Sequence, residues 1–341
     1  MSTRDDLLAS IANTSKDYQV GVRPAPTPAH VDRWVNQFDS AVQLPILTEL
    51  DHVLKKTYFN RELVAWFLKG LIINKDLAGN DPCSFWRGIN FLDIQQGGNS
   101  QRDMLSLFDS FLYEHCGVHV AGCGGTEPVY VYLDDVIFTG GRVLQDMSSW
   151  IKTSAPAKAK VHIITIAYHR GGQYYAKNKI AEVADAAKKK IELVWWRCIE
   201  IEDTKARINT SDVLRPTMLP PADTLVAAYA AGMQHKPIFR TPSSVGMNEF
   251  FSSETGRHVL EQEFLKAGVR IRQMCPHFIA YQRPLGTMGL ETLGFGSLIV
   301  TYRNCPNNAP LALWAGDPWY PLFERTTNSA TAIKRLFGGT S

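Results

Sequence analysis

The residue types best suited to chemistry lie close together in residues 128–144, which read PVYVYLDDVIFTGGRVL. The apolar start predicts a strand over 129–133, and Asp134 and Asp135 then place two carboxylates at its carboxyl end. Thr139, Gly140 and Gly141 follow in a turn that opens a predicted helix. A helix N-terminus offers unpaired N–H groups that favour phosphate, and glycines let an anion approach the backbone closely. The segment therefore predicts an acidic pair beside an anion-binding turn.

These two features suit different parts of one ligand. A carboxylate accepts hydrogen bonds and cannot donate them, so Asp134 and Asp135 suit hydroxyl groups or a hydrated divalent cation. The turn suits phosphate, and Thr139 adds a hydroxyl donor. A ribose 5-phosphate carries a diol and a phosphate at the required separation. The alternative is an ordinary strand, turn and helix that bind no ligand.

The elements around this segment alternate between strand and helix. Short apolar runs at 91–94, 129–133, 161–168 and 191–196 predict strands, and 102–114, 141–151 and 178–190 predict helices. This alternation is typical of an α/β fold with a parallel sheet. Residues 161–167 are apolar enough for a strand that is buried on both faces. In such a sheet, ligands bind beyond the carboxyl ends of the strands.

The flanking regions predict a larger architecture around this core. Residues 1–30 end in a Pro-rich stretch and predict a flexible lead-in, and 31–84 predict helices with a break near Pro45. We assign 85–205 to the core and 206–341 to an α+β elaboration packed on it. Within the elaboration we expect helices over 222–233 and 253–267, the second stopping at Gly268, and a strand over 294–303. Glu261 and Glu263 are expected on a solvated helix face.

Composition excludes several classes of protein. Of 341 residues, 45% are hydrophobic and 20% charged, which fits a folded globular chain and excludes wholesale disorder. The net charge of +3 is too small to indicate a nucleic-acid binder by itself. Six cysteines form no CxxC pair and no zinc-ligand spacing, so we expect reduced thiols and no metal site. No signal peptide or membrane-spanning run is evident, so a cytoplasmic protein without membrane contact is expected.

The segment Asp134-Asp-Val-Ile-Phe-Thr-Gly-Gly141 resembles the signature of the type I phosphoribosyltransferases, in which an acidic pair, three residues and Thr-Gly-Gly-Thr follow a strand. The resemblance implies that the catalytic residues Asp134 and Asp135 hold the ribose hydroxyls. It also implies that Phe138, Thr139, Gly140, Gly141 and Arg142 bind the 5-phosphate. Arg142 departs from the family, which has Thr or Ser at this position. It either strengthens phosphate binding or fills the phosphate site and prevents turnover.

The same resemblance implies a pyrophosphate loop after an earlier strand. The candidate is residues 95–100, where Gly97, Gly98, Asn99 and Ser100 would present backbone N–H groups to an anion. Mg²⁺ would arrive with the donor. A further loop over 168–177 would lie beside the site, and its acceptor-binding candidates are His169, Arg170, Tyr174 and Lys177. The alternative for both segments is an ordinary solvated loop.

Segments outside the core resemble a narrower group of proteins. Residues 31–38, 261–271, 293–297, 302–311 and 319–323 resemble the phosphoribosyltransferase-like (PRTase-CE) effectors of bacterial conflict systems, some of them encoded in retron anti-phage operons. The similarity covers about 31–327. It implies an oligomeric effector that transfers or cleaves at ribose C1, with phosphoribosyl pyrophosphate or a related ribosyl donor. The alternatives are an inactive subunit held by a reverse transcriptase ribonucleoprotein, and an enzyme that cleaves a dinucleotide.

Overall fold

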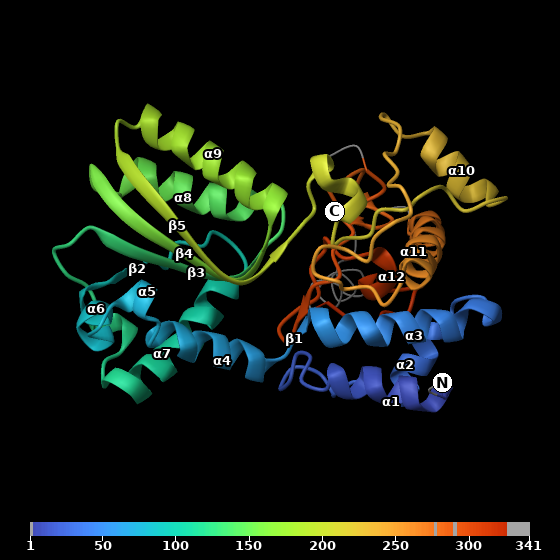
Figure 1. Cartoon of the computed structure of the whole chain (residues 1–341), viewed down its shortest axis with the longest axis horizontal. Helices are drawn as coiled ribbons and strands as arrows, with labels where there is room; N and C mark the ends of the chain where they lie inside the picture. Colours follow the sequence, from blue (N-terminus) through green and yellow to red (C-terminus); the bar gives the residue numbers. More distant parts are fainter. Residues whose placement is uncertain (1–2, 276–277, 289–291, 326–341) are drawn as a thin grey trace, which may run out of the picture. The chain divides into compact units, whose positions relative to one another are not determined.

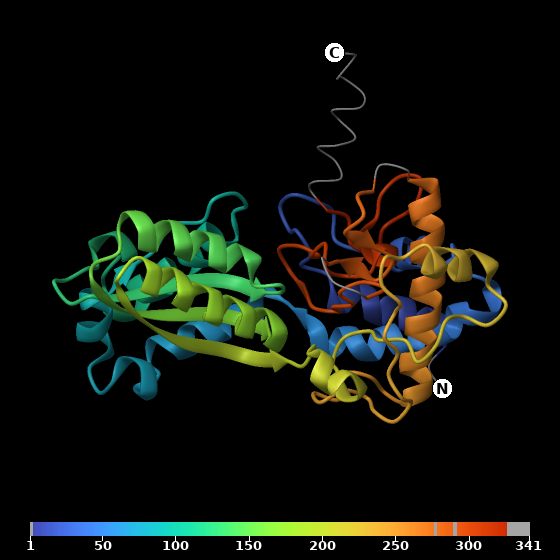
Figure 2. The same ribbon diagram turned by 90° about the horizontal axis from the view of Figure 1, so that it is seen from above.

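The computed structural model describes residues 3–275, 278–288 and 292–325. The chain forms two compact units (Figures 1 and 2). The sheet unit is Glu62–Ile201, and the helical unit combines Met1–Arg61 with Glu202–Ser341. Each unit has its own buried core. Among the described residues, no helix combines the length and apolar character needed to cross a membrane.

The sheet unit contains a four-stranded parallel sheet, which confirms the predicted α/β core. Its strands are β2 (Asn90–Phe91), β3 (Val129–Ile137), β4 (Lys158–His169) and β5 (Lys190–Ile201), adjacent in that order. β4 is buried over most of its length, as its apolar sequence predicts. β3 continues four residues beyond its predicted end, so Asp134 and Asp135 lie inside the strand. Asp134 pairs in register with Thr165 of β4.

Helices connect these strands and cover both faces of the sheet. α8 (Gly141–Thr153) and α9 (Arg170–Ala186) lie side by side on one face (Figures 1 and 2). α7 (Ser100–Cys116) packs against β3 from the other face, where α4 (Arg61–Ile72) and α6 (Pro82–Gly88) also lie (Figure 1). The short elements α5 (Lys75–Ala78) and η1 (Val120–Gly122) complete the unit. Tyr132, Met147 and Ile163 are among the residues of its core.

The helical unit is built from the two ends of the described chain. Its helices are α1 (Arg4–Thr14), α2 (Pro28–Val35), α3 (Ser40–Thr57), η2 (Lys205–Thr210), α10 (Thr224–Ala231), α11 (Glu254–Met274) and α12 (Leu311–Trp314). The parallel pair of β1 (Tyr58–Phe59) and β8 (Val300–Thr301) joins the two segments, and β6 (Gln282–Arg283) pairs antiparallel with β7 (Gly286–Thr287).

Residues 3–30 do not form the flexible lead-in that was predicted for 1–30. Thr3 caps α1 through a capping box, and the helix buries Leu7, Leu8 and Ile11. The hydroxyl of Tyr18 donates to the carbonyl oxygen of Glu324 at 3.0 Å. Burial of the apolar face and a contact across about 300 residues of sequence fix this segment, and neither is visible in its polar composition.

Three local predictions in the helical unit were wrong for steric or electrostatic reasons. α11 continues past Gly268 to Met274, because this glycine serves close packing: a Cβ there would lie 2.5 Å from the carbonyl oxygen of Pro284. The predicted strand over 294–303 shrinks to β8, since Gly294 and Gly296 have positive φ angles of 144° and 76°. Glu261 is fully buried between Arg240 and Arg257, at 2.8 Å from each.

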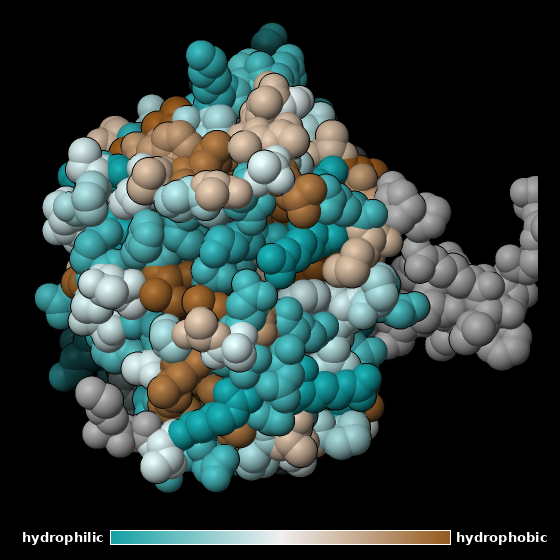
Figure 3. Space-filling model, turned by 90° about the vertical axis from the view of Figure 1, so that its right-hand side faces the viewer, coloured by the Kyte–Doolittle hydropathy of each residue, from teal (hydrophilic) through white to brown (hydrophobic). Residues whose placement is uncertain are grey.

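Most of the large apolar residues in the flanking segments belong to the cores. Trp34, Phe38, Phe295 and Phe323 are buried, whereas Trp66 of α4 is 70% exposed. Figure 3 shows one face of the molecule, on which apolar and polar surface alternate. Eleven large apolar side chains among the described residues of the helical unit are 37–71% exposed: Val20, Val22, Leu44, Met218, Leu225, Ile238, Phe239, Met247, Met274, Ile279 and Tyr281. Isolated exposed apolar residues are ordinary on a protein surface.

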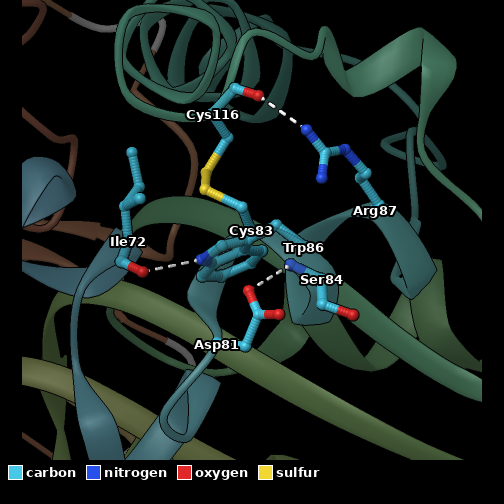
Figure 4. The surroundings of a disulfide bond; sticks show 7 residues. All are labelled: Ile72, Asp81, Cys83, Ser84, Trp86, Arg87 and Cys116. Atoms are coloured by element: carbon cyan, nitrogen blue, oxygen red, sulfur yellow. Dashed lines mark hydrogen bonds between the residues drawn. A yellow bond between two sulfur atoms is a disulfide. The ribbon is translucent and has the colours of Figure 1, made fainter.

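The prediction that every cysteine is reduced was wrong for one pair. Cys83 of α6 and Cys116 at the end of α7 form a disulfide (Figure 4). The packing of α6 against the end of α7 brings their Cα atoms to 5.3 Å, a separation within the range that a disulfide requires. The two cysteines lie 33 positions apart in the sequence, so their spacing does not predict that they form a disulfide. The other four cysteines form no disulfide.

Candidate functional site

The acidic pair lies near the carboxyl end of β3, but its two side chains point to opposite faces, because side chains alternate along a strand. Asp134 is 5% exposed and lies on the same face as Tyr132. One of its oxygens accepts the N–H of Asp135 at 2.8 Å, and the other lies 3.3 Å from the hydroxyl of Tyr132. Asp135 is half-buried and accepts the N–H of Val136 at 2.7 Å. The two carboxylates are therefore not equivalent.

Burial raises the pKa of Asp134 to about 7, and the charge of Asp135 adds to the rise. Hydrogen bonds from Ser100, the backbone of Asp135 and Tyr132 oppose that rise. The Tyr132 hydroxyl is closer to Asp146 of α8, at 2.9 Å. Tyr132 can donate its proton to Asp146 and accept one from a protonated Asp134. At neutral pH the carboxyl group of Asp134 is therefore able to donate a hydrogen bond as well as accept one.

The predicted pyrophosphate loop follows β2 and leads into α7. Gly97 and Gly98 have φ angles of +94° and +85°, a backbone region that favours glycine. Gln101, which is fully buried, holds the start of the loop: its side-chain oxygen accepts the N–H groups of Ile94 and Gln95 at 2.8 and 2.9 Å. Asn99 occupies the position before α7, and Ser100 accepts a hydrogen bond from the Gln95 amide at 2.8 Å.

A second anchor ties this loop to the face covered by α8. The buried carboxylate of Asp146 accepts the N–H of Gln96 at 3.1 Å, and the side chain of Gln96 donates to Ser149 at 2.9 Å. The guanidinium group of Arg142, in the first turn of α8, donates to the carbonyl oxygen of Gln96. The structure therefore brings the loop over residues 95–100 and the start of α8 together.

The phosphate turn comprises Phe138, Thr139 and Gly140, after which α8 begins at Gly141. Gly140 has a φ of +77°, and a Cβ on it would lie 2.2 Å from the carbonyl oxygen of Gly172 in α9. A Cβ on Gly172 would lie 1.8 Å from the carbonyl oxygen of Phe138. The turn is therefore shaped by contact with α9. Thr139 and Gly141 are exposed, so a ligand can reach them.

The predicted acceptor loop does not exist as a loop. β4 ends at His169 and α9 starts at Arg170, because the two glycines that suggest a loop permit the contact of α9 with the turn. His169 is buried, and its Nδ1 lies 3.0 Å from the carbonyl oxygen of Ile137, to which it can only donate. Arg170 pairs with Glu200 at 3.3 Å. Tyr174 and Lys177 are exposed, three residues apart on α9.

Sequence reasoning missed four residues that fix the site, namely Gln101, Tyr132, Asp146 and Gly172. Three of them are polar residues buried in the sheet unit, and their partners lie up to 50 residues away in the chain. The only local signal was the adjacent pair Gly171 and Gly172.

Comparison with known proteins identifies the family. No curated protein and no solved structure matches the chain. The PRTase-CE family model matches residues 31–325, which is most of the chain and spans both units. This range agrees with the 31–327 expected from the motifs. The chain therefore belongs to the PRTase-CE family and is phosphoribosyltransferase-like.

Proposed function

We propose that the chain binds a ribosyl-phosphate donor of the phosphoribosyl pyrophosphate type at the carboxyl ends of β2 and β3. One observation carries the proposal: Arg142 and Asp146 both bond to Gln96 and so hold two glycine-rich turns around the acidic pair. A donor with a 5-phosphate at one end of its ribose and a pyrophosphate at C1 needs two anion sites, one on either side of a hydroxyl-binding group.

In this proposal each segment takes one part of the donor. The turn from Phe138 to Gly141 holds the 5-phosphate, and Arg142 offers it a charged partner. Gly97, Gly98, Asn99 and Ser100 hold the pyrophosphate. Asp135, which is half-buried, accepts a hydrogen bond from a ribose hydroxyl. Asp134 contributes to ribose binding through its oxygens, which are also hydrogen-bonded within the protein.

Mg²⁺ fits this site only in company with the donor. Within the described residues, the acidic pair is not part of any group of three metal-ligating side chains, and its two members point to opposite faces. Asp135 would hold the ion through a water molecule, while the donor's phosphates would supply most of its oxygen ligands. Bound there, the ion would offset charge on the leaving pyrophosphate.

The proposed reaction breaks the bond between ribose C1 and the pyrophosphate oxygen, which keeps the bonding electrons. C1 then passes through an oxocarbenium-like state and bonds to a nucleophile, either water or an acceptor. The carboxylate of Asp135 would stabilise the positive charge on the sugar, and Asp134 would add to this when it is ionised. Tyr174 and Lys177, exposed on α9, are candidates for contact with the acceptor.

The test is incubation of the purified chain with phosphoribosyl pyrophosphate and Mg²⁺, followed by mass spectrometry of all small products. We expect release of pyrophosphate from the wild type and none from Asp135→Asn. A dinucleotide is tested in parallel, because the same diol and phosphate occur in it. If titration calorimetry detects no binding of either compound, the proposal is wrong.

A second function has an observation in its favour. Asp134 is buried and hydrogen-bonded, and Arg142 replaces a small hydroxyl residue in the phosphate turn. Both features suit a subunit that binds the donor without consuming it. Calorimetric binding with no product would favour this function over the enzyme.

We also propose that the chain acts within an anti-phage system as an oligomeric complex, with a protein partner such as a reverse transcriptase ribonucleoprotein. The exposed Trp66 on α4 supports an apolar contact. Sedimentation of the chain alone and with such a partner, at low and high salt, tests this. A chain that stays monomeric and binds no partner would contradict it.

A further inference from the structure

The C-terminal end of α7 and the neighbouring α6 carry three side chains that the proposed function does not use. Cys83 of α6, His115 and Cys116 of α7 place their sulfur and ring nitrogen atoms within 4.8 Å of one another. Cys116 is buried, Cys83 is half-buried and His115 is exposed, so the group opens to solvent on the histidine side. Two sulfurs and one imidazole are the donor set that proteins offer to zinc.

The backbone around the two cysteines is held independently of the disulfide (Figure 4). Arg87 donates to the carbonyl oxygen of Cys116 at 3.0 Å, and the Trp86 indole donates to the carbonyl oxygen of Ile72 at 2.9 Å. Asp81 caps the start of α6 by accepting the N–H of Ser84 at 3.0 Å. Both cysteines therefore stay close together when the bond between them is broken.

We propose that the reduced chain binds one zinc ion through the Cys83 and Cys116 thiolates and His115. Zn–S and Zn–N bonds of about 2.3 and 2.0 Å place tetrahedral ligands roughly 3.5–3.8 Å apart, within the separation that the three groups allow. After reduction the two sulfurs must move apart, and the imidazole of His115 must lie within ligand distance of both. Three protein ligands leave the fourth position for water or an exchangeable ligand.

The chemistry balances with an ordinary dithiol as the reductant. The disulfide accepts two electrons and two protons from the dithiol, which becomes a cyclic disulfide, and two protein thiols result. Zinc then displaces both thiol protons. Either link, the disulfide or the metal, ties α6 to the end of α7. The other end of α7 begins at Ser100, the last residue of the candidate pyrophosphate loop.

The test is zinc binding by the full chain after reduction with a phosphine that is then removed. Competition with a chromophoric chelator should give one zinc per chain, and Co²⁺ should give a thiolate-to-metal absorption band. We expect Cys83→Ser to abolish both signals and His115→Ala to weaken zinc binding at least about tenfold. The oxidised wild type should bind none.

Two matched controls use groups outside the cluster. Cys198→Ser removes an exposed cysteine, and His119→Ala removes a nearby exposed histidine that pairs with Asp109. Both should bind zinc like the wild type. Because His115 is exposed, His115→Ala should fold even if Cys83→Ser does not. No zinc binding by the reduced wild type, or unchanged binding in His115→Ala, would overturn the proposal.

Discussion

Asp134 is a buried carboxyl group whose pKa is raised well above its ordinary value. Its folded-state pKa of about 7 lies above the ordinary value of 3.8. The folded chain therefore binds more protons than the unfolded chain between about pH 4 and pH 7. The stability that this group contributes is fully present below pH 4 and is lost as the pH rises through 7. Burial is the main cause, so the effect belongs to the fold.

The first prediction follows from the loss of stability that Asp134 causes as the pH rises. Asp134→Asn removes the charge, and the Asn amide can donate to the Tyr132 oxygen, so the variant should gain stability relative to the wild type as the pH rises from 4 to 8. The gain should be on the order of a few kcal/mol. Chemical denaturation of both proteins at several pH values measures it. A difference that does not change with pH would show that Asp134 is ionised throughout.

Asp135 leads to a different prediction, because its side chain is only half-buried. Asp135→Asn should leave the unfolding midpoint within about 1 kcal/mol of the wild type and abolish turnover of the donor. Circular dichroism and the product assay measure the two effects. Full activity in a folded Asp135→Asn variant would remove this residue from the site.

Arg142 links the two proposed anion-binding loops by donating to the carbonyl oxygen of Gln96. Arg142→Ala should weaken binding of phosphoribosyl pyrophosphate by about 1.5–3 kcal/mol, or roughly 10- to 150-fold, the range for a hydrogen bond to a charged group. Lys152→Ala, which removes a cation from the other end of α8, is the control. Calorimetry decides between the two proposed roles: weaker binding supports a phosphate ligand, whereas tighter binding or new turnover in Arg142→Thr would show that Arg142 blocks the site.

At the scale of elements, the sheet and its connecting helices could be predicted because their signals are local. Apolar runs in the sequence predicted β3, β4 and β5. The spacing of the acidic and glycine residues from Asp134 to Gly141 predicted the turn. The start of α9 could not be predicted, since Gly171 and Gly172 are typical of a loop. In the structure Gly172 lies against the carbonyl oxygen of Phe138, where a side chain would not fit. The sequence alone does not show this contact. The residues that hold the site, such as Asp146 and Gln101, act across 6 to 50 positions of sequence.

The contact between the predicted phosphate turn and α9 leads to the next prediction. Gly172→Ala places a Cβ 1.8 Å from a backbone oxygen, so the turn must shift. We expect a loss of about 1–3 kcal/mol in unfolding free energy, with loss of donor binding. For stability, Gly141→Ala at the start of α8 is the matched control, because its Cβ would meet nothing closer than 3.6 Å. Equal stability of the two variants would mean that α9 does not shape the turn.

At the scale of the whole molecule, the two ends of the described chain build one unit and a continuous middle segment builds the other. In the helical unit the pairing of β1 with β8 joins these two ends. No pattern within one segment predicts such a partner at the other end of the chain. The sheet unit, by contrast, needs only neighbouring segments, which explains why its sequence was the easier to interpret.

The last prediction concerns the independence of the sheet unit. Every proposed donor-binding and acceptor-binding residue, from Gly97 to Lys177, lies in Glu62–Ile201. This segment is continuous and has its own core. A fragment of residues 60–202, which keeps α4 and β5 whole, should therefore fold alone and bind phosphoribosyl pyrophosphate. Its affinity should lie within about tenfold of that of the full chain, because the proposed ligands come from this unit alone.

Circular dichroism, thermal unfolding and calorimetry of the fragment provide the measurement, and the fragment with Asp135→Asn is the control. Loss of binding in a cooperatively folded fragment, with binding retained by the full chain, would show that the helical unit contributes to the site. A fragment that does not fold would instead show that the core of the sheet unit depends on the rest of the chain. Both outcomes contradict a self-sufficient site at the carboxyl ends of β2 and β3.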